Sequence, residues 1–588
     1  MTQRCCLPLF AVQVVVCSEI ELSECGFLFM SFFQCGMSMF RRANFGWLAL
    51  IIVLLGLSAV DAGAQSVSVA TYRYDNSRTG KNQHEVNLTA AVVNQSSFGK
   101  LFSQAVDGQV YAEPLYLPNI VIPKQGQHNV VYVATEHDSV YAFDADNSMG
   151  KNAAPLWHVS FINPANGITT VPSSDLSTVL IVPEIGITGT PVIDSGAGTL
   201  YVSAATKENG VYVQRLHALD VTTGAEKFGG PVVIAATVSG GGVGSSGGVV
   251  SFDPFRSNQR PGLLLSNGVV YIAWASHGLE NEYPYHGWVI GYNENTLAQV
   301  AAYCATPNGN QGGIWQSGGG LSADSLGSLF FLTGNGTFDA NNGGSDYGTS
   351  FVRLSTTQGL TLADYFTPYN QAQLSASDTD IGSGGALLLP YQTGVAHPYL
   401  AVGAGKNGVI YMVDRTKMGH FNSSGNSQIV QSIVNAFNGH GLYATPAYWQ
   451  GQLYFWADQD VLRIFAMNNG LITTTPIAMS TFTMNSGATP VVSSNGGANG
   501  IVWAIQSDQF ATAGPAVLHA LDANTAVELY NSSQAGNRDT AGPAVKFTVP
   551  TVINGKVYVG TANQLDVYGV MSGAPEDGVA RAELVHRR

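Results

Sequence analysis

The chain has few charged side chains for its length and little excess of basic residues anywhere. Only 11% of its 588 residues are Asp, Glu, Lys or Arg, against about 25% in an average soluble domain. Acidic residues outnumber basic ones by 39 to 25, which gives a formal net charge of −14. Because nucleic-acid binding needs a basic surface, this balance argues against a nucleic-acid partner. The 68 glycines are typical of a turn-rich all-β protein.

Cysteine is scarce outside the first 38 residues, and several catalytic motifs are missing. Cys304 is the one cysteine after position 38; the others are Cys5, Cys6, Cys17, Cys25 and Cys35. The region after position 38 therefore cannot form an internal disulfide. No HExxH, CxxC or CxxCH motif occurs, so neither a zinc protease nor an attached c-type haem is supported. GxGxxG and GxSxG matches within 242–248 lie in a Gly/Ser loop before a strand, which is the wrong context for either motif.

The amino terminus predicts export. Residues 39–64 have the pattern of a signal peptide, with Arg41-Arg42 before an apolar run and small residues ending at Ala64. The apolar run is shorter than the roughly 20 residues that span a bilayer, so we expect no retained membrane span. Residues 1–38 contain no repeat, and we expect them to be a mis-called extension. We expect a periplasmic or secreted protein, cleaved near Ala64.

A strand–turn–strand unit repeats about eight times along the rest of the chain. The clearest copies lie at 189–220, 488–523 and 548–568; looser copies start near Glu113, Ser251, Ser317, Gly384 and Ala444. Units rich in Val, Ile and Tyr that bury an apolar face against their neighbours are typical of a β-propeller. We predict an all-β, eight-bladed propeller of four-stranded antiparallel blades over 108–570. Residues 65–107 would be a lead-in that closes the ring, and 571–588 a flexible tail.

Propeller topology places several polar residues on one face of the ring. If the strands of a blade are A to D from the axis outward, the B–C loops and the D–A connections share a face. Glu208, Asn335 and Lys406 fall in predicted B–C loops, and Asp378 and Asp380 fall in a D–A connection. Ordinary turn chemistry is an alternative explanation, because Asn-Gly occurs at 209–210, 335–336 and 407–408.

Five stretches in a fixed order resemble the quinoprotein dehydrogenases. They are FFLTGNGTF (330–338), YGTSFVRLS (347–355), FTPYN (366–370), DTDIGSGGALL (378–388) and LAVGAGKNGVIYMVDRTKMG (400–419). The resemblance implies an eight-bladed propeller that binds pyrroloquinoline quinone and Ca²⁺.

The resemblance also implies roles for individual residues. Asn335 matches a metal-ligating Asn, and Glu208 matches a metal-ligating Glu with an offset of one residue. Asp378 matches the catalytic base and a metal ligand, Asp380 matches a neighbouring carboxylate at the cofactor, and Lys406 matches the basic residue beside the quinone. These residue types suit hard-oxygen coordination of Ca²⁺ and proton removal from a hydroxyl group.

Two features of the family pattern are absent. The adjacent cysteines that cap the quinone in many members do not occur after position 38, and the tryptophan that would underlie the quinone is expected near Gly318. Trp315, three residues earlier, is the available substitute for cofactor binding, although a tryptophan here can equally pack between blades.

Three functions are therefore open. The first is an exported dehydrogenase that oxidises an alcohol or sugar and passes electrons to a separate acceptor. The second is a non-catalytic propeller that binds a protein partner. The third is a carbohydrate-binding protein, suggested by Tyr283, Tyr285 and Trp288 in expected mouth-side loops.

Overall fold

The computed structural model describes residues 67–176, 180–278 and 284–571. They all belong to a unit that runs from Ser66 to Arg588. The expected extension (1–38), signal peptide (39–64) and cleavage site, and nearly all of the expected tail, lie outside the described residues. Within the described part of the chain, no helix is both long enough and apolar enough to cross a membrane. Cys304 is buried and is not in a disulfide.

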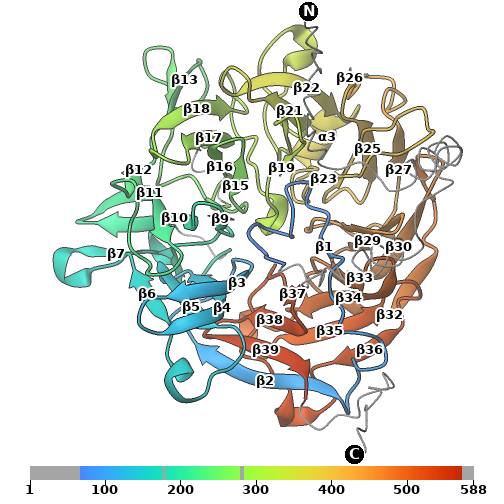
Figure 1. Ribbon diagram of the computed structural model, residues 1–588. Coiled ribbons are helices and arrows are strands. Elements are labelled where there is room, and N and C mark those ends of the chain that lie inside the picture. The colour runs from blue at the N-terminus through green and yellow to red at the C-terminus, as the bar shows by residue number, and fades with distance from the viewer. Residues whose placement is uncertain (1–66, 177–179, 279–283, 572–588) are drawn as a thin grey trace, which may run out of the picture. The chain divides into compact units, whose positions relative to one another are not determined.

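Eight antiparallel sheets surround a common centre, which confirms the predicted eight-bladed propeller (Figure 1). Each blade has four main strands, which are named in order from the inside outward. Blade 1 contains β3 (Leu115–Ile122), β4 (Gly126–Thr135), β5 (Ser139–Asp144) and β6 (Trp157–Ser160), and blade 2 contains β9 (Val192–Asp194), β10 (Thr199–Glu208), β11 (Val211–Asp220) and β12 (Val232–Val233). Blade 3 contains β15 (Leu264–Ser266), β16 (Val269–Trp274), β17 (Trp288–Asn293) and β18 (Gln299–Cys304). Blade 4 contains β19 (Ser322–Ala323), β20 (Leu329–Leu332), β21 (Phe351–Ser355) and β22 (Thr361–Thr367).

The remaining four blades follow in chain order. Blade 5 contains β23 (Leu387–Leu388), β24 (Leu400–Ala404), β25 (Ile410–Asp414) and β27 (Gln431–Ile433), and blade 6 contains β28 (Ala447–Trp449), β29 (Gln452–Trp456), β30 (Asp460–Asn468) and β32 (Ala478–Met484). Blade 7 contains β33 (Val491–Asn495), β34 (Ala498–Gln506), β35 (Val517–Asp522) and β36 (Glu528–Asn531). Blade 8 contains β37 (Thr551–Ile553), β38 (Lys556–Gly560), β39 (Gln564–Val570) and β2 (Phe98–Ala105). The outer strand of blade 8, β2, comes from before blade 1 and pairs with β39 from Phe98↔Val570 to Ala105↔Gln564. The ring is thus closed by strands from opposite ends of the described chain.

Short elements decorate the blades. They are β1 (Lys81–Asn82), β7 (Ile168–Pro172), β8 (Glu184–Ile185), β13 (Thr237–Ser239), β14 (Val249–Ser251), β26 (His420–Phe421), β31 (Leu471–Ile472), helix α3 (Gln371–Ala376) and the 3₁₀ turns η1 (Gly150–Ala153), η2 (Pro164–Asn166), η3 (Ser173–Leu176), η4 (Gln316–Gly318), η5 (Ala340–Asn342), η6 (Phe510–Thr512) and η7 (Gly536–Arg538).

The middle strands are buried on both faces because each blade is covered by its two neighbours. All six residues of β5 and all four residues of β20 are buried. One core cluster joins Val131 of blade 1 to Val202 of blade 2 and Val567 of blade 8. The sequences of these strands are therefore continuous apolar runs bounded by turns, without alternation of apolar and polar residues, as expected of strands packed on both sides.

Residues 69–84, the plug segment, fill the centre of the ring (the dark-blue trace in Figure 1). This segment hydrogen-bonds to the second residue of the inner strand of all eight blades. The bonds are Val69 with Tyr116, Ala70 O with Ile193 N, Asn76 Nδ2 with Leu265 O, Asn76 O with Ala323 N, Ser77 O with Leu388 N, Thr79 O with Tyr448 N, Gly80 O with Val492 N, and Asn82 Nδ2 with Val552 O. The inner strand of each blade thus obtains a hydrogen-bond partner from the plug segment.

Two fully buried arginines anchor the plug segment. Arg73 donates to Pro490 O at 2.7 Å and to Pro446 O at 2.8 Å, while its own backbone N–H donates to a carboxylate oxygen of Glu113. Arg78 donates to Leu321 O at 2.8 Å. Burial lowers the pKa of both guanidinium groups, but both stay charged at neutral pH, and carbonyl dipoles from several blades compensate the charge.

Candidate functional site

A cavity of about 300 Å³ lies among loops from blades 2, 3, 4, 5, 6 and 8. Its lining residues come from D–A connections and B–C loops, the two loop classes expected to share a face. They are Leu180, Ile181, Asn258, Arg260, Gly278, Trp315, Ser317, Asn335, Asp378, Asp380, Ser383, Lys406, Tyr443, Lys546 and Phe547. The structure thus brings Trp315, Asn335, Asp378, Asp380 and Lys406 together around one cavity of a size that suits a small ligand.

Lys406 lies between the two aspartates. Its ammonium is 2.5 Å from Asp378 Oδ1 and 2.8 Å from Asp380 Oδ1. The Asp380 side chain is 2% exposed, whereas that of Asp378 is 71% exposed. Burial raises the pKa of Asp380 despite the attraction of Lys406. Burial alone would lower the pKa of Lys406, but attraction to Asp380 and Asp378 outweighs it and the pKa is raised, so Lys406 is a permanent cation here.

Asn335 also contacts the exposed aspartate. Its Nδ2 donates to Asp378 Oδ1 at 2.6 Å. Its Oδ1 is shielded from solvent and has no hydrogen-bond partner among the described residues. Both bonds to Asp378 use Oδ1, which leaves Asp378 Oδ2 available to a ligand, and Asn335 adds a spare acceptor.

Backbone hydrogen bonds fix these loops to each other. Lys406 N donates to Asp380 O at 3.0 Å, Gln316 N donates to Gly382 O at 3.0 Å, and Gly334 N donates to Gly313 O at 2.8 Å. Gly382 lies so close to the backbone of Gly334 that a Cβ at position 382 would clash with it. The glycine therefore allows the loop that carries Asp380 to reach the loop that carries Asn335.

Trp315 is half-buried on the cavity wall. Atoms of its indole lie next to Gly313 and Gly334, within 3.1 Å of where a Cβ would stand on either glycine. The two residues that follow, Gln316 and Ser317, have φ values of 44° and 46°. Residues other than glycine rarely adopt this left-handed backbone conformation, which is often found at ligand sites.

Four charged or aromatic lining residues were not singled out from the sequence: Arg260, Tyr443, Lys546 and Phe547. Arg260 precedes β15, Tyr443 precedes β28, and the other two precede β37. All four thus occupy D–A connections, as Asp378 and Asp380 do, so the topological argument used for the aspartates would also have found them. Their position in a D–A connection is the one feature of the sequence that indicates them.

The expectation that Glu208 joins the site is wrong. Glu208 ends β10 and forms an ion pair with Arg215 in a separate pocket, which also contains Thr206 and His217. The β10–β11 pairing is regular to its last pair, Glu208↔Val211. Because side chains alternate along a strand, Lys207 and Glu208 point to opposite faces.

The predicted metal ligand set is therefore not assembled. Glu208, Asn335 and Asp378 do not share a cavity, and a cation, the Lys406 ammonium, already lies between Asp378 and Asp380. Among the residues that the structure describes, no group of three or more His, Cys, Asp or Glu side chains is arranged to hold a metal ion.

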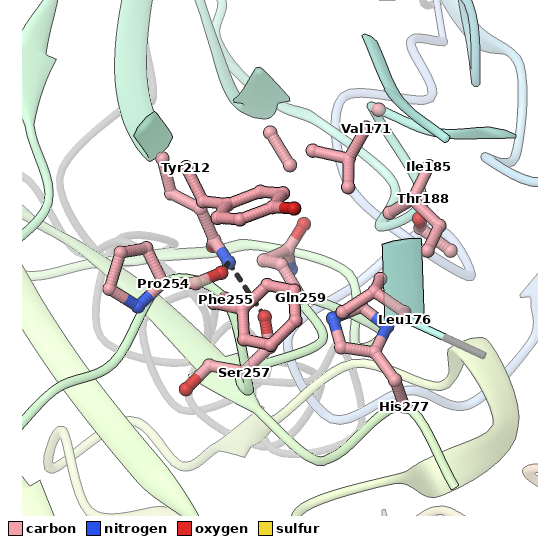
Figure 2. Close-up of a pocket in the computed structure, with 13 residues that line it drawn as sticks. Val171, Leu176, Ile185, Thr188, Tyr212, Pro254, Phe255, Ser257, Gln259 and His277 are labelled. Carbon is pink, nitrogen blue, oxygen red and sulfur yellow. Dashed lines mark hydrogen bonds between the residues drawn. The ribbon is translucent and has the colours of Figure 1, made fainter. Parts of the chain in front are cut away.

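A second cavity, shown in Figure 2, is much smaller. It measures about 10 Å³ and is lined by Leu176, Tyr212, Phe255, Gln259, His277 and neighbouring residues. Burial lowers the pKa of His277 to about 4, so this imidazole is neutral at neutral pH. A volume near 10 Å³ holds about one water molecule, which excludes an organic ligand.

The aromatic residues that suggested carbohydrate binding do not form a surface. Tyr285 is 3% exposed and Trp288 is 1% exposed, and Tyr283 lies outside the described residues. Trp288 begins β17 and packs edge-on against Phe252 with ring centroids 6.1 Å apart. Buried rings cannot stack on a sugar from solvent, so this expectation is wrong for Tyr285 and Trp288.

No protein-family model matches the chain, and no curated protein is similar to it in sequence.

Several solved structures share the fold. The chain superposes on quinohaemoprotein alcohol dehydrogenase from Pseudomonas putida HK5 with a TM-score of 0.52 at 14% identity, covering 87% of this chain and 82% of that one. The corresponding enzyme from Comamonas testosteroni gives 0.53 at 15% identity, with 87% and 82% covered. A europium-containing methanol dehydrogenase gives 0.55 at 13% identity, with 86% and 98% covered. At these identities the likeness concerns the fold of the propeller.

Proposed function

We propose that the protein is a dehydrogenase that oxidises a hydroxyl group of an alcohol or sugar with pyrroloquinoline quinone. One observation carries the proposal. The residues that the quinoprotein resemblance assigns to the base, its neighbouring carboxylate and the basic residue beside the quinone are Asp378, Asp380 and Lys406, and all three line one cavity.

The chain's own residues can supply the proton chemistry. Asp378 is exposed and its Oδ2 is available, so it can accept the proton of a bound hydroxyl group. Lys406 forms an ion pair with Asp378 at 2.5 Å, and the hydrogen bond from Asn335 fixes the orientation of the carboxylate. Lys406 also supplies a positive charge that stabilises negative charge developing in the cavity.

The cavity suits a flat quinone. Its volume of about 300 Å³ is at the lower end for small-molecule sites, and the indole of Trp315 offers an aromatic wall. When bound, pyrroloquinoline quinone supplies the acceptor for the hydride that leaves the substrate carbon. Trp315, Asp380 and Lys406 are the residues we propose to hold it.

We assign no role to Ca²⁺. The ligand set expected from the resemblance needs Glu208, which lies in another pocket, and the Lys406 ammonium already forms ion pairs with both aspartates. Any Ca²⁺ that binds would need ligands other than the predicted set.

Export and electron transfer complete the proposal. The signal-like residues 39–64 predict a periplasmic or secreted location, which mass spectrometry of the amino terminus tests directly. Electrons would pass to a separate acceptor, because the sequence has no CxxCH motif for attached haem.

Quinone binding and dye-linked oxidation test the function. We expect pyrroloquinoline quinone to quench the tryptophan fluorescence of the purified protein and to support dye-linked oxidation of at least one alcohol or sugar. D378N is expected to lower kcat by about a hundredfold or more with little change in quinone affinity.

E208Q is the matched control, since it neutralises the acidic residue that lies outside the cavity. It is expected to behave like the wild-type protein in both assays. The proposal fails if the wild-type protein binds no quinone, or if D378N and E208Q have the same activity. A propeller that binds a protein partner would then be the better description.

A further inference from the structure

We propose that Arg260 and Lys546 form a carboxylate-binding subsite within the cavity, so that the ligand is a ring-shaped molecule that carries a carboxylate group. This inference rests on the proposed function only for the statement that the ligand is then oxidised. The recognition of a carboxylate rests on the two cations themselves.

Arg260 is buried with an unused donor. Its side chain lines the cavity, the residue is 4% exposed, and its Nη1 has no hydrogen-bond partner among the described residues. Its Nη2 makes a long bond of 3.4 Å to Ser317 O. A buried guanidinium with an unsatisfied N–H is costly unless a ligand supplies the acceptor, and its planar fork matches a carboxylate.

Lys546 is the second cation. It lies over the rings of Phe510 and Phe547, at 5.2 Å and 5.8 Å from their centroids. Phe547 also lies under Arg260, whose Cζ is 5.8 Å from the same ring centroid. The two cations therefore approach one aromatic ring, and each lowers the energy of an anion bound near the other.

Among the residues that the structure describes, no carboxylate forms an ion pair with either of these two groups. Within the described ranges, neither Arg260 nor Lys546 has an acidic oxygen within 4.0 Å, the limit for an ion pair. Glu136 attracts Arg260 from further away, but its carboxylate accepts a hydrogen bond from Gly186 N. By contrast, Lys406 in the same cavity is fully compensated by Asp378 and Asp380.

The subsite and the proposed base therefore differ in charge. The part lined by Asp378 and Asp380 has no net positive charge once Lys406 is counted, and Arg260 with Lys546 adds up to two positive charges. Tyr443 and Phe547, whose rings stack with centroids 6.2 Å apart, supply apolar contact beside the cations. A hydroxyl group at Asp378 and a carboxylate at Arg260 describe a sugar acid or another hydroxy acid; alternatively, the carboxylate belongs to the quinone.

Binding of a sugar acid and its neutral counterpart tests the subsite. We would titrate the purified protein, without added quinone, with D-glucuronate and with D-glucose by isothermal titration calorimetry. Pyrroloquinoline quinone would be titrated separately. We expect K546M and R260K to lower the affinity for the carboxylate-bearing ligand by about tenfold or more. K546R is expected to keep most of the affinity because it keeps the charge.

Each outcome has a distinct meaning. Loss of glucuronate affinity in the variants assigns the subsite to a substrate carboxylate, and selective loss of quinone affinity assigns it to the cofactor. Unchanged affinity for both ligands, or no binding of either to the wild-type protein, overturns the inference. If glucuronate binds through Lys546 but neither it nor any other alcohol or sugar is oxidised with quinone and dye, the subsite stands and the proposed dehydrogenase function fails.

Discussion

The ammonium of Lys406 lies 2.8 Å from the Oδ1 atom of Asp380, a carboxylate that is 2% exposed. The other oxygen of Asp380 accepts a hydrogen bond from Gly382 N at 2.8 Å. Burial opposes the charge on Asp380, and Lys406 provides the opposite charge that makes it tolerable. The stability of this loop therefore depends on the protonation state of Asp380.

Removing the lysine is expected to destabilise the protein in a pH-dependent way. K406M leaves Asp380 buried and unpaired, which raises its pKa further above its unfolded value. The stability of K406M is therefore greatest at low pH, where Asp380 is protonated, and is lost as the pH rises through the folded pKa. We expect a loss of about 3 kcal/mol at pH 8 and a smaller loss at pH 5, measured by urea unfolding.

D378N and the double variant K406M/D380N are the controls. Asp378 is 71% exposed, so D378N is expected to change stability little. The double variant is expected to recover part of the loss, because the uncompensated charge is gone. A loss in K406M that is the same at both pH values would contradict this account of Asp380.

Anion binding is expected to take up protons near pH 8. Burial, assisted by repulsion from Arg260, lowers the pKa of Lys546 to about 8. A carboxylate bound beside Lys546 favours the ammonium form and raises this pKa, so binding at pH 8 to 9 draws a fraction of a proton from the buffer. Affinity should accordingly fall as the pH rises from 7 to 9.

Calorimetry in two buffers with different ionisation enthalpies measures the proton uptake. K546M should show no uptake near pH 8, because the titrating group has been removed. Arg260 stays protonated over this range and contributes equally at every point. A pH-independent affinity in the wild-type protein would count against a role for Lys546.

Glu136 is expected to reduce stability above neutral pH. Burial raises its pKa to about 7, and the residue is 2% exposed. A carboxyl group whose folded pKa is raised contributes stability that is fully present below its unfolded pKa and is lost as the pH rises to about 7, an effect of up to about 3 kcal/mol. E136Q keeps an oxygen acceptor for Gly186 N and removes the titration.

We therefore expect the fall in Tm between pH 5 and pH 8 to be smaller in E136Q than in the wild-type protein. D253N is a suitable control, since the Asp253 side chain is 46% exposed. The expectation is wrong if the two variants have parallel profiles of Tm against pH.

The fold was predictable because it repeats. Copies such as 189–220 and 548–568 coincide with β9 to β11 and with β37 to β39. Each copy is a local hairpin pattern, and eight of them determine the ring. The plug segment was not predictable in this way, because its hydrogen bonds join residues 69–84 to strands as distant in sequence as β37. No local sequence pattern indicates such contacts.

The candidate site was predictable as far as topology determines it. Membership of a B–C loop or a D–A connection was enough to bring Asn335, Asp378 and Lys406 to one cavity. Topology did not determine the direction of the Glu208 side chain. An offset of one residue reverses the face of a strand on which a side chain lies, and the resemblance placed Glu208 with an offset of one. The chemical roles of the cavity residues stay predictions.

Arg73 offers a test of the plug segment as a stabilising element. Its side chain is fully buried and donates to the carbonyl groups of Pro446 and Pro490, each immediately before the inner strand of a blade. R73A leaves these buried acceptors unsatisfied and opens a cavity, and each unsatisfied group costs about 1–3 kcal/mol. We expect a loss of roughly 4 kcal/mol in urea unfolding. K417A removes an exposed cation and should change stability by less than about 0.5 kcal/mol.

R73K keeps the outcome interpretable if R73A does not fold. A lysine keeps the charge but lacks the planar fork that reaches two carbonyl groups at once, so R73K should fold with an intermediate stability. The same order, wild type above R73K above R73A, should appear in resistance to limited proteolysis, because loosening the plug frees the inner strands of every blade it contacts. Equal stability of R73K, R73A and K417A would show that the centre of the ring is held by the blades alone.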